Sequence, residues 1–212
     1  MKIISVNSLA IPEVKVIRYQ RFTDQRGYFT ETFRRSDFQG HPDLAFLRGL
    51  EFTQGNESHS RPGVIRGLHF QWNPYMGKLV RTIQGRMIDL ILDIRKGSPT
   101  LGKAIAYDLP YDPSAGHGEW IWIPVGFAHG NFFTTESRIE YFCTGEYSPG
   151  CEAGISPLAP DIDWSLCNTD LKREFNTLTG TQPLMSVKDR EGFTMQSWMA
   201  DDRSDNFIFE KV

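Results

Sequence analysis

Arg66-Gly67-Leu68-His69 and the lysine that follows it, Lys78, are the side chains in this sequence best suited to move a proton. A turn between two strands would bring both cations beside the imidazole, and neighbouring positive charge favours the neutral form of a histidine. A neutral imidazole can accept a proton at neutral pH, as a general base must. From this spacing alone, a core histidine satisfied by hydrogen bonds remains the alternative for His69.

The segments around His69 and His129 resemble the two signature motifs of the cupin barrels. The second motif, G-x5-P-x-G-x2-H, is complete up to its histidine, His129. The first is incomplete, because Gln71 stands where a metal-binding cupin has its second histidine, and Tyr75 and Met76 fall where its glutamate belongs. Two isolated histidines do not make a three- or four-ligand site. We therefore expect no bound metal, and we expect His129 to be a buried, hydrogen-bonded core residue.

Short β-rich runs punctuated by glycine and proline fill the first three quarters of the chain. Their spacing of roughly ten residues is typical of sandwiches and barrels. No helical crossover separates them, which favours antiparallel pairing. The predicted strands are Val14–Arg18, Tyr28–Phe33, Gly63–Phe70, Lys78–Ile83, Met87–Ile94, Ala104–Leu109, Trp120–Ile123, His129–Thr134 and Ile139–Thr144. With the cupin-like motif, this pattern predicts an all-β double-stranded β-helix, a jelly-roll barrel.

Helix signals are confined to two short stretches, Ser36–Gly49 and Thr169–Thr177. Asp201–Asn206 is polar and is expected to be a surface turn before a final apolar tail, Phe207–Phe209. No composition shift or Pro/Gly/Ser tract suggests a linker. We therefore predict a single domain over residues 1–212, with short helices flanking the barrel.

Composition narrows the classes of function. The formal net charge of −3 argues against a protein that works through the phosphate backbone of nucleic acid. The odd number of cysteines, without CxxC spacing, favours neither a disulfide framework nor a zinc site. The N-terminal segment lacks the apolar run of a signal peptide, and no stretch approaches the length of a membrane span. We expect a soluble protein of the cytoplasm that does not bind a membrane.

Seven ordered blocks resemble the dTDP-4-dehydrorhamnose 3,5-epimerase family, and together they cover nearly the whole chain. They are FTDQRGYFTE (Phe22–Glu31), QGNES (Gln54–Ser58), GVIRGLH (Gly63–His69), GKLVR (Gly77–Arg81), DIRKGSPT (Asp93–Thr100), IPVGFAHG (Ile123–Gly130) and SVKD (Ser186–Asp189). The resemblance implies a cofactor-independent isomerase of deoxysugar or polysaccharide biosynthesis. Its substrate would be a nucleotide-linked 4-keto-6-deoxy sugar whose carbons beside the ketone are inverted.

The resemblance also implies a role for each catalytic side chain. His69 would be the base that removes the proton from the sugar, and Asp189 would orient its ring and stabilise the imidazolium. Lys78 would stabilise the enolate that develops at the ketone oxygen. Tyr141, aligned with a tyrosine on a late strand, would return a proton to the opposite face. Taken singly, each of the last three residues could instead be an ordinary strand or turn residue.

The same resemblance implies the substrate-binding residues. Gln54, Asn56 and Arg66 would hold the diphosphate and the sugar. Tyr147 would stack on the nucleotide base, and Glu152 follows it as in the family. These residues come from separate segments of the chain, so only a folded barrel could bring them together.

An N-terminal arm is implied to complete the site of a neighbouring subunit. Phe22, Arg26 and Glu31 match the residues of the family's arm that contact the nucleotide. Charged residues on an edge strand also call for a partner that covers them. We therefore expect a homodimer that exchanges its arms.

The chain departs from the family pattern at Phe142, Gly145-Glu146 and Asn131, all near the predicted sugar and base. Members of this group that invert a single carbon, or that act on GDP- or CDP-linked sugars, are therefore alternatives. A metal-dependent cupin enzyme acting through His69 and His129 is another. A catalytically silent sugar-nucleotide-binding jelly roll is the alternative outside the enzymes.

Overall fold

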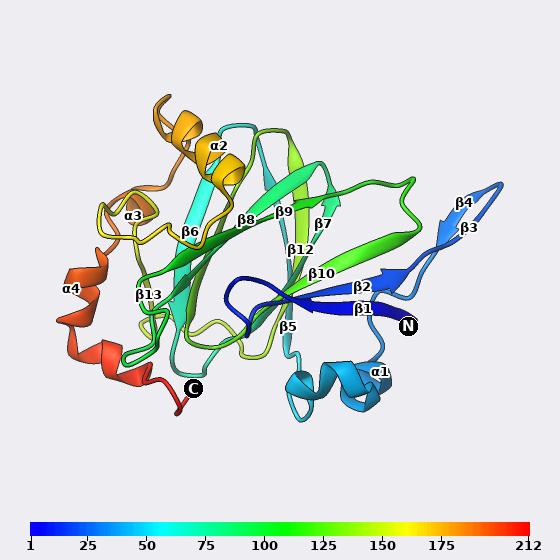
Figure 1. Cartoon of the computed structure of the whole chain (residues 1–212), viewed down its shortest axis with the longest axis horizontal. Helices are drawn as coiled ribbons and strands as arrows, with labels where there is room; N and C mark the ends of the chain where they lie inside the picture. The colour runs from blue at the N-terminus through cyan, green and yellow to red at the C-terminus, as the bar shows by residue number, and fades with distance from the viewer.

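Two antiparallel sheets form the body of the protein, and the computed structural model describes residues 1–212 (Figure 1). The first sheet contains, in spatial order, β1 (Ile3–Ser8), β2 (Lys15–Gln20), β10 (His117–Ile123), β7 (Lys78–Gln84), β12 (Ser137–Cys143) and β5 (Gln54–Ser60). The second contains β13 (Glu152–Gly154), β6 (Ile65–Gln71), β11 (Phe127–Phe132), β8 (Arg86–Asp93) and β9 (Ala104–Pro110). This arrangement confirms the predicted all-β, cupin-like jelly roll.

The buried apolar side chains form three layers, because successive side chains along a strand point to opposite faces of its sheet. On β8, Met87 and Ile91 belong to the cluster between the two sheets, whereas Leu90 and Leu92 belong to the cluster on the outer face of the second sheet. Successive side chains of a strand point to opposite faces, which explains the division. A third cluster, around Trp120, covers the outer face of the first sheet. The space between the sheets is apolar only in part, and its remainder is lined by polar side chains.

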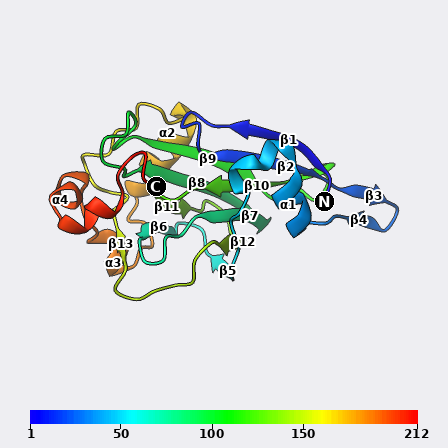
Figure 2. The ribbon, with the colours of Figure 1, turned by 90° about the horizontal axis from the view of Figure 1, so that it is seen from below.

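Short helices cover the outer faces (Figure 2). Those that pack on the first sheet are α1 (Arg35–Gly40) and η1 (Pro42–Leu47), through Phe38, Leu44 and Leu47. Those of the second half of the chain are α2 (Thr169–Thr179), α3 (Val187–Arg190), α4 (Met195–Met199) and η2 (Asp202–Asn206). In this group, α2 and α4 bury Phe175 and Trp198 against the second sheet.

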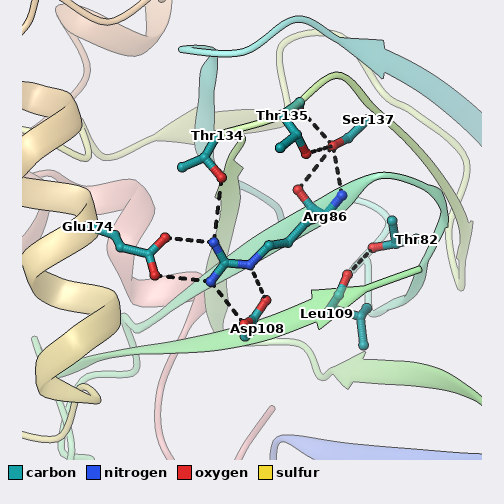
Figure 3. A network of polar contacts seen from close by, with 8 residues as sticks. All are labelled: Thr82, Arg86, Asp108, Leu109, Thr134, Thr135, Ser137 and Glu174. Carbon is teal, nitrogen blue, oxygen red and sulfur yellow. Dashed lines mark hydrogen bonds and ion pairs between the residues drawn. The ribbon is translucent and has the colours of Figure 1, made fainter. Parts of the chain in front are cut away.

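Arg86 ties α2 to the second sheet (Figure 3). Its guanidinium donates to both carboxylate oxygens of Asp108 on β9, at 2.8 and 2.9 Å, and to both of Glu174 on α2, at 2.7 and 3.1 Å. The pKa of Arg86 is raised, first by the hydrogen bonds to Glu174 and then by those to Asp108. Nearby, the Thr82 hydroxyl donates to the Leu109 carbonyl at 2.6 Å and links β7 of one sheet to β9 of the other.

The DIRKGSPT block (Asp93–Thr100) is held together by hydrogen bonds to a buried carboxylate. The Asp93 carboxylate is 0% exposed and accepts hydrogen bonds from the backbone and guanidinium of Arg95 and from the hydroxyls of Ser98 and Thr100. Gly97 takes a φ of +84°, a conformation that glycine adopts without strain. The block therefore closes the turn after β8 and does not line the site described below.

A two-stranded hairpin of β3 (Phe22–Asp24) and β4 (Gly27–Phe29) projects beyond both sheets, as Figures 1 and 2 show. The predicted strand Tyr28–Phe33 is therefore wrong beyond Phe29. Phe22 and Phe29 are 50% and 68% exposed, and they do not pack into any of the three apolar clusters. The hairpin presents aromatic side chains to the outside.

The other eight predicted strands each overlap an observed strand, whereas four observed strands were not predicted: β1, β3, β5 and β13. The strand β5 has no apolar periodicity, because its inward side chains line a polar cavity. The predicted helix Ser36–Gly49 is wrong as a single helix, since it breaks into α1 and η1 at Pro42, whose ring cannot continue a helix. The predicted surface turn Asp201–Asn206 is largely exposed and contains the short 3-10 helix η2, whose Ser204 is buried.

Candidate active site

Two adjoining cavities open within the polar part of the space between the sheets. The first, of about 360 Å³, is called the Asn131 lobe and is lined by Ser58, Arg66, Gly67, His69, Lys78, His129, Gly130, Asn131, Ile139, Tyr141, Ser186, Lys188 and Asp189. The second, of about 390 Å³, is called the Tyr147 lobe and is lined by Gln54, Asn56, His69, Phe70, Gln71, Met76, Lys78, Tyr141, Cys143, Tyr147 and Glu152. His69, Lys78 and Tyr141 belong to both lobes and mark their junction.

His69 forms a pair with Asp189 at this junction. The ring Nε2 lies 2.7 Å from Asp189 Oδ1, and the Asp189 side chain is 8% exposed. Burial raises the pKa of Asp189, but the hydrogen bond and charge of His69 and the bond from Ser186 outweigh it, so that the pKa is lowered overall. An ionised carboxylate can only accept, so His69 Nε2 carries the proton and Nδ1 is left able to receive one.

The helix α3 holds Asp189 in place. Its N-cap is Ser186, whose hydroxyl accepts a hydrogen bond from the Asp189 backbone N–H at 3.0 Å. A serine at this position satisfies one of the free N–H groups that begin a helix. The SVKD block is thus a capped helical turn that aims one carboxylate at a histidine 120 residues earlier in the chain.

A bulge between β6 and β11 lets Arg66 and His69 face the same cavity. Residues three apart on a regular strand point to opposite faces. Here His129 pairs with His69 and Asn131 with Arg66, with an irregular register between them. The bulge requires two glycines in contact: a Cβ on Gly67 would lie 2.5 Å from Gly130 Cα. The glycine of the RGLH segment therefore serves the geometry of the site.

Lys78 brings a cation to the junction from the first sheet. Its Nζ donates to the His69 carbonyl oxygen at 3.3 Å. Burial lowers the pKa of Lys78, against the opposing effects of Cys143, Asp89 and Glu152. The ammonium group faces the cavity with hydrogen-bonding capacity to spare, since it has three donors and one protein partner.

Tyr141 approaches from β12, on the wall opposite β6. Its hydroxyl makes no hydrogen bond with a protein group, although its side chain lines both lobes. Burial raises the pKa of Tyr141, with Cys143 adding to this effect and Arg66 opposing it. The hydroxyl is therefore protonated at neutral pH and free to bond to a ligand.

His129 is buried and hydrogen-bonded, as the sequence predicts, but it also lines the Asn131 lobe. Its Nε2 lies 2.6 Å from Asp89 Oδ1, and the two side chains are 7% and 0% exposed. Asn131, Ser58 and Lys188 line the same lobe. In the sequence, Asn131 stands only as a departure from the family pattern near the predicted sugar, and Ser58 and Lys188 have no predicted role. Strand alternation was the available signal, because Asn131 lies two residues from His129.

The Tyr147 lobe has an aromatic ring at its rim and amides in its wall. The Gln54 side chain accepts from the Tyr147 backbone N–H at 2.7 Å and donates to the side-chain oxygen Oδ1 of Asn56 at 3.1 Å. The Tyr147 ring is 54% exposed, and its hydroxyl donates to Glu152 at 2.9 Å. A half-exposed ring above polar side chains suits a flat polar group such as a nucleobase.

Gln71, at the position of a metal-binding cupin's second histidine, holds the loop of this lobe. Its amide donates to the carbonyls of Pro74 and Glu146, and its oxygen accepts from the Ser148 backbone N–H. Its side chain is therefore fully occupied in positioning the segment that carries Tyr147. The chain has no group of three or more His, Cys, Asp or Glu side chains arranged to hold a metal ion.

Arg66 is close to the cavity, and the arm residues are not. Arg66 donates to the Ser60 hydroxyl and the His59 carbonyl, each at 3.0 Å, and lines the Asn131 lobe. Phe22, Arg26 and Glu31 line neither lobe of their own chain.

The charges of the arm are paired within the chain. Arg26 forms an ion pair with Asp24, and Glu31 forms one with Arg34. These ion pairs neither require nor contradict a partner subunit, so the homodimer with exchanged arms stays a prediction. In addition, no helix of the chain has the length and apolar character needed to cross a bilayer.

Comparison with known proteins identifies related sequences. A family model described as dTDP-4-dehydrorhamnose 3,5-epimerase matches residues 8–197. An enzyme of that name from Shigella flexneri is 39% identical over 186 residues, covering 86% of this chain and 91% of the relative. The one from Sinorhizobium fredii is 42% identical over 168 residues, covering 76% and 81%. A relative from Neisseria gonorrhoeae is 38% identical over 188 residues, which span only 51% of that longer protein.

Solved structures agree with the sequence comparison. A dTDP-6-deoxy-D-glucose-3,5-epimerase from Legionella pneumophila, in complex with dTDP-4-keto-L-rhamnose, superposes with a TM-score of 0.79 at 30% identity, covering 98% of this chain and 99% of the other. A 4-keto-6-deoxy sugar epimerase of novobiocin biosynthesis from Streptomyces spheroides has a TM-score of 0.75 at 26% identity, with 94% and 91% covered. The chain belongs to the dTDP-4-dehydrorhamnose 3,5-epimerase family, a family of isomerases.

Proposed function

We propose that this protein inverts one or both carbons beside the ketone of a nucleotide-linked 4-keto-6-deoxy sugar. The observation that carries the proposal is the position of His69 and Tyr141 on facing sheets of one cavity. Inversion needs a base on one face of a carbon and an acid on the other. A paired imidazole and an unpaired phenol hydroxyl meet that need.

Proton removal is assigned to His69. Its Nδ1 takes the hydrogen from the carbon beside the ketone, and the C–H electron pair moves into an enolate. Lys78 stabilises the charge on the enolate oxygen, where a fixed cation in a partly dry cavity has its largest effect. Asp189 stabilises the imidazolium that forms and holds the ring in one orientation.

Proton return is assigned to Tyr141. Its hydroxyl gives a proton to the opposite face of the same carbon, and the enolate collapses to the ketone with inverted configuration. Water then restores the proton of Tyr141 and removes that of His69. The proton returned to carbon therefore comes from a group that exchanges with solvent.

The Tyr147 lobe is proposed to hold the nucleotide. Tyr147 would stack on the base. Gln54 and Asn56 of the same lobe, together with Arg66 of the Asn131 lobe, would hold the diphosphate and the sugar. Glu152 orients the tyrosine through its hydroxyl. Relatives at 39% and 42% identity are named for dTDP-linked substrates, which favours dTDP over GDP or CDP.

A homodimer is proposed to complete the site. The projecting hairpin exposes Phe22 and Phe29, which have no apolar surface to cover in their own chain. Inserted at the mouth of a neighbour's Tyr147 lobe, these rings would bury area, and Arg26 and Glu31 would contact the nucleotide.

The test is isotope exchange from solvent. We expect dTDP-4-keto-6-deoxyglucose, incubated with the protein in heavy water, to gain deuterium at carbon 3, carbon 5 or both. Proton NMR identifies the carbon. The GDP- and CDP-linked sugars, tested in parallel, identify the nucleotide. Absence of deuterium from every ketosugar would contradict the proposed function.

A matched pair of variants separates catalysis from folding. His69→Asn should abolish exchange while the thermal transition stays near that of the wild type. His59→Asn makes the same change on β5, at an exposed histidine paired with Glu136 outside both lobes. It should exchange at the wild-type rate. Equal loss of exchange in both variants would remove His69 from the role of base.

A further inference from the structure

A further cavity, of about 360 Å³, is lined by strands of both sheets and shares no lining residue with either lobe of the candidate site. On β7 it is lined by Thr82, four residues along the strand from Lys78. Thr82 and Leu109, whose hydrogen bond joins the two sheets in Figure 3, are part of its lining. It is called the Arg21 cavity, and its charged and aromatic lining includes Arg18, Arg21, Tyr107, Tyr111 and Glu119.

Arg21 is a buried cation without an anionic partner in the chain. It lies between β2 and β3, at the root of the projecting hairpin, and is 7% exposed. Its Nη1 donates to the backbone carbonyls of Asp112 and Ala115. Its Nε is enclosed and unpaired, whereas Nη2 makes no hydrogen bond and is not among the enclosed unpaired atoms, so a ligand can reach it. Buried charges are ordinarily paired, and this one lines a cavity.

The acidic side chains on the sheets around the cavity are already paired with other cations. Glu119 forms an ion pair with Arg18 at 2.5 Å and accepts a hydrogen bond from the Tyr107 hydroxyl at 3.1 Å. Asp108 is held by Arg86 at 2.8 Å. Neither carboxylate forms an ion pair with the guanidinium at the root of the hairpin.

The loop between β9 and β10 does not neutralise Arg21 either. Asp112 on this loop is exposed, and its carboxylate accepts from the backbone N–H and the hydroxyl of Ser114, at 2.8 and 2.6 Å. Only the backbone carbonyl of Asp112 meets the guanidinium, and the two side chains form no ion pair. A carboxylate in water is screened and compensates a buried cation weakly.

Two tyrosines complete the surroundings of Arg21. The guanidinium carbon lies 4.3 Å from the ring centroid of Tyr28, on β4, and 5.3 Å from that of Tyr111. Rings stack on the face of a guanidinium and leave the N–H groups in its plane unused. The two hydroxyls lie 2.8 Å apart, and the single bond between them uses one of their two hydrogens. The other hydroxyl hydrogen can be donated to a ligand.

We infer that the Arg21 cavity binds a small carboxylic acid in its ionised form. The two N–H groups of Nη2 and a tyrosine hydroxyl are donors, and a carboxylate only accepts. One negative charge balances one uncompensated cation, whereas Glu119 and Asp108 in the same lining repel a doubly charged phosphate. The tyrosine rings suit an acid with a flat apolar body. This site is independent of the proposed epimerase reaction.

Calorimetric titration with benzoate tests the inference. The wild type should bind benzoate at least about 10-fold more tightly than benzamide, its neutral analogue, or inorganic phosphate. Arg21→Gln keeps an amide donor and removes the charge, so benzoate should bind roughly 10- to 100-fold more weakly. No binding of benzoate or acetate, equal binding of benzoate and benzamide, or unchanged benzoate binding in Arg21→Gln would overturn the inference.

Two further variants support the comparison. Arg35→Gln makes the same change at an exposed arginine that pairs with Glu51 outside the cavity, and it should bind benzoate as the wild type does. Tyr111→Phe keeps the ring, removes one hydroxyl and should weaken benzoate binding about 2- to 10-fold, which tests the site even if Arg21→Gln does not fold. Equal weakening in Arg35→Gln and Arg21→Gln would show a general effect of charge and would contradict the site.

Hydrogen exchange locates the bound acid. Because Arg21 contacts Tyr28 and the carbonyls of Asp112 and Ala115, benzoate should slow amide exchange in residues 21–29 and 111–116. Residues 66–71 of β6, in the candidate active site, should exchange at an unchanged rate. Protection confined to residues 66–71 would place the acid in the other cavities and would overturn the inference.

Sedimentation distinguishes a free acid from a carboxylate of a second copy of the chain. Saturating benzoate, and Arg21→Gln, should leave the sedimentation coefficient unchanged if the ligand is a free acid. If both dissociate an oligomer, the carboxylate belongs to a neighbouring chain, and the inference of a small-molecule ligand is wrong.

Discussion

His69 and His129 lie opposite each other in the β6–β11 ladder, yet their Nε2 atoms bond to different carboxylates. Asp189 from α3 lies 2.7 Å from His69, and Asp89 from β8 lies 2.6 Å from His129. Burial raises the pKa of Asp89, against the effects of His129 and Lys78. A separate carboxylate for each ring fixes both orientations, so that one cavity contains two independently held imidazoles.

Asp189→Asn should lower the exchange rate by about 10²–10⁴-fold. The amide cannot stabilise an imidazolium, and it can hold the ring in the wrong tautomer. Deuterium incorporation measures the rate, and a thermal melt reports folding. Asp170→Asn, at an exposed aspartate on α2, is the control and should be as active as the wild type. Activity within a few-fold of wild type in Asp189→Asn would show that the pair is not needed.

Lys78 should impose an alkaline limit on activity. Because burial lowers its pKa, Lys78 loses its proton at a lower pH than a lysine in water. As pH rises through this lowered pKa, the charge that stabilises the enolate is lost and kcat/KM should fall. Lys78→Arg keeps its charge throughout, so its residual activity should persist to higher pH. The same alkaline limb in both proteins would assign that titration to another group.

Asp93→Asn should destabilise the fold by about 1–3 kcal/mol, because it leaves the buried Arg95 with the half-exposed Glu13 as its only ionic partner. Burial raises the pKa of Asp93, but bonds from Arg95, Ser98 and Thr100 outweigh it and lower the pKa. A lowered carboxylate pKa stabilises the fold above the unfolded-state value, and this contribution is lost as pH falls through the folded-state value.

Urea titrations across acidic pH measure both effects. The stability difference between wild type and Asp93→Asn should be largest near neutrality and shrink in acid. Asp24→Asn removes an exposed ion pair with Arg26 and should change stability little. A difference that does not vary with pH would show that the charge of Asp93 is not what stabilises the turn.

Gly67→Ala should disrupt the bulge that turns both Arg66 and His69 toward the cavity. The new Cβ would lie 2.5 Å from Gly130 Cα, and the φ of +107° strains any other residue. We expect a loss of about 1–3 kcal/mol in stability and a larger loss in exchange. Gly116→Ala is the control, because its Cβ would meet nothing within 4 Å. Full activity in Gly67→Ala would mean that the bulge does not set the site.

Complementation should reveal whether the arm acts in a neighbouring site. Arg26→Ala and His69→Asn should each be impaired alone. When the two variants are mixed and exchange subunits, a mixed dimer has one site with both residues intact. That site takes His69 from the Arg26→Ala chain and Arg26 from the His69→Asn chain, so activity should reappear. No recovery, or a monomer by sedimentation, would contradict the exchanged arm.

Local sequence patterns were sufficient to predict the barrel fold and many of the residues of the candidate site. Alternation and turns predicted the strands that carry apolar residues, such as β8, and ordered blocks indicated His69, Lys78, Tyr141 and Asp189. The structure places these four side chains in one cavity. The strand β5 escaped prediction because its inward residues are polar, and hydrophobic periodicity is the signal on which such predictions depend.

The arrangement around Asn131 could not be derived from local patterns. Nothing in the sequence shows that its amide and the Ser58 hydroxyl meet the same space, since they come from strands in different sheets. The structural roles of Gln71 and of the Asp93 block could not be predicted from the sequence for the same reason. Their partners are defined by packing between segments, and not by spacing within one.

By itself, the sequence determined that the chain is a cupin-like barrel and that His69 is the candidate for its catalytic base. Only the tertiary structure decided that Asp189 reaches His69, that Arg66 faces the same cavity, and that Asn131 is left without a partner. The physical reason is register. A bulge of one residue reverses the face on which every later side chain emerges, and strand pairing across the barrel sets which distant residues meet.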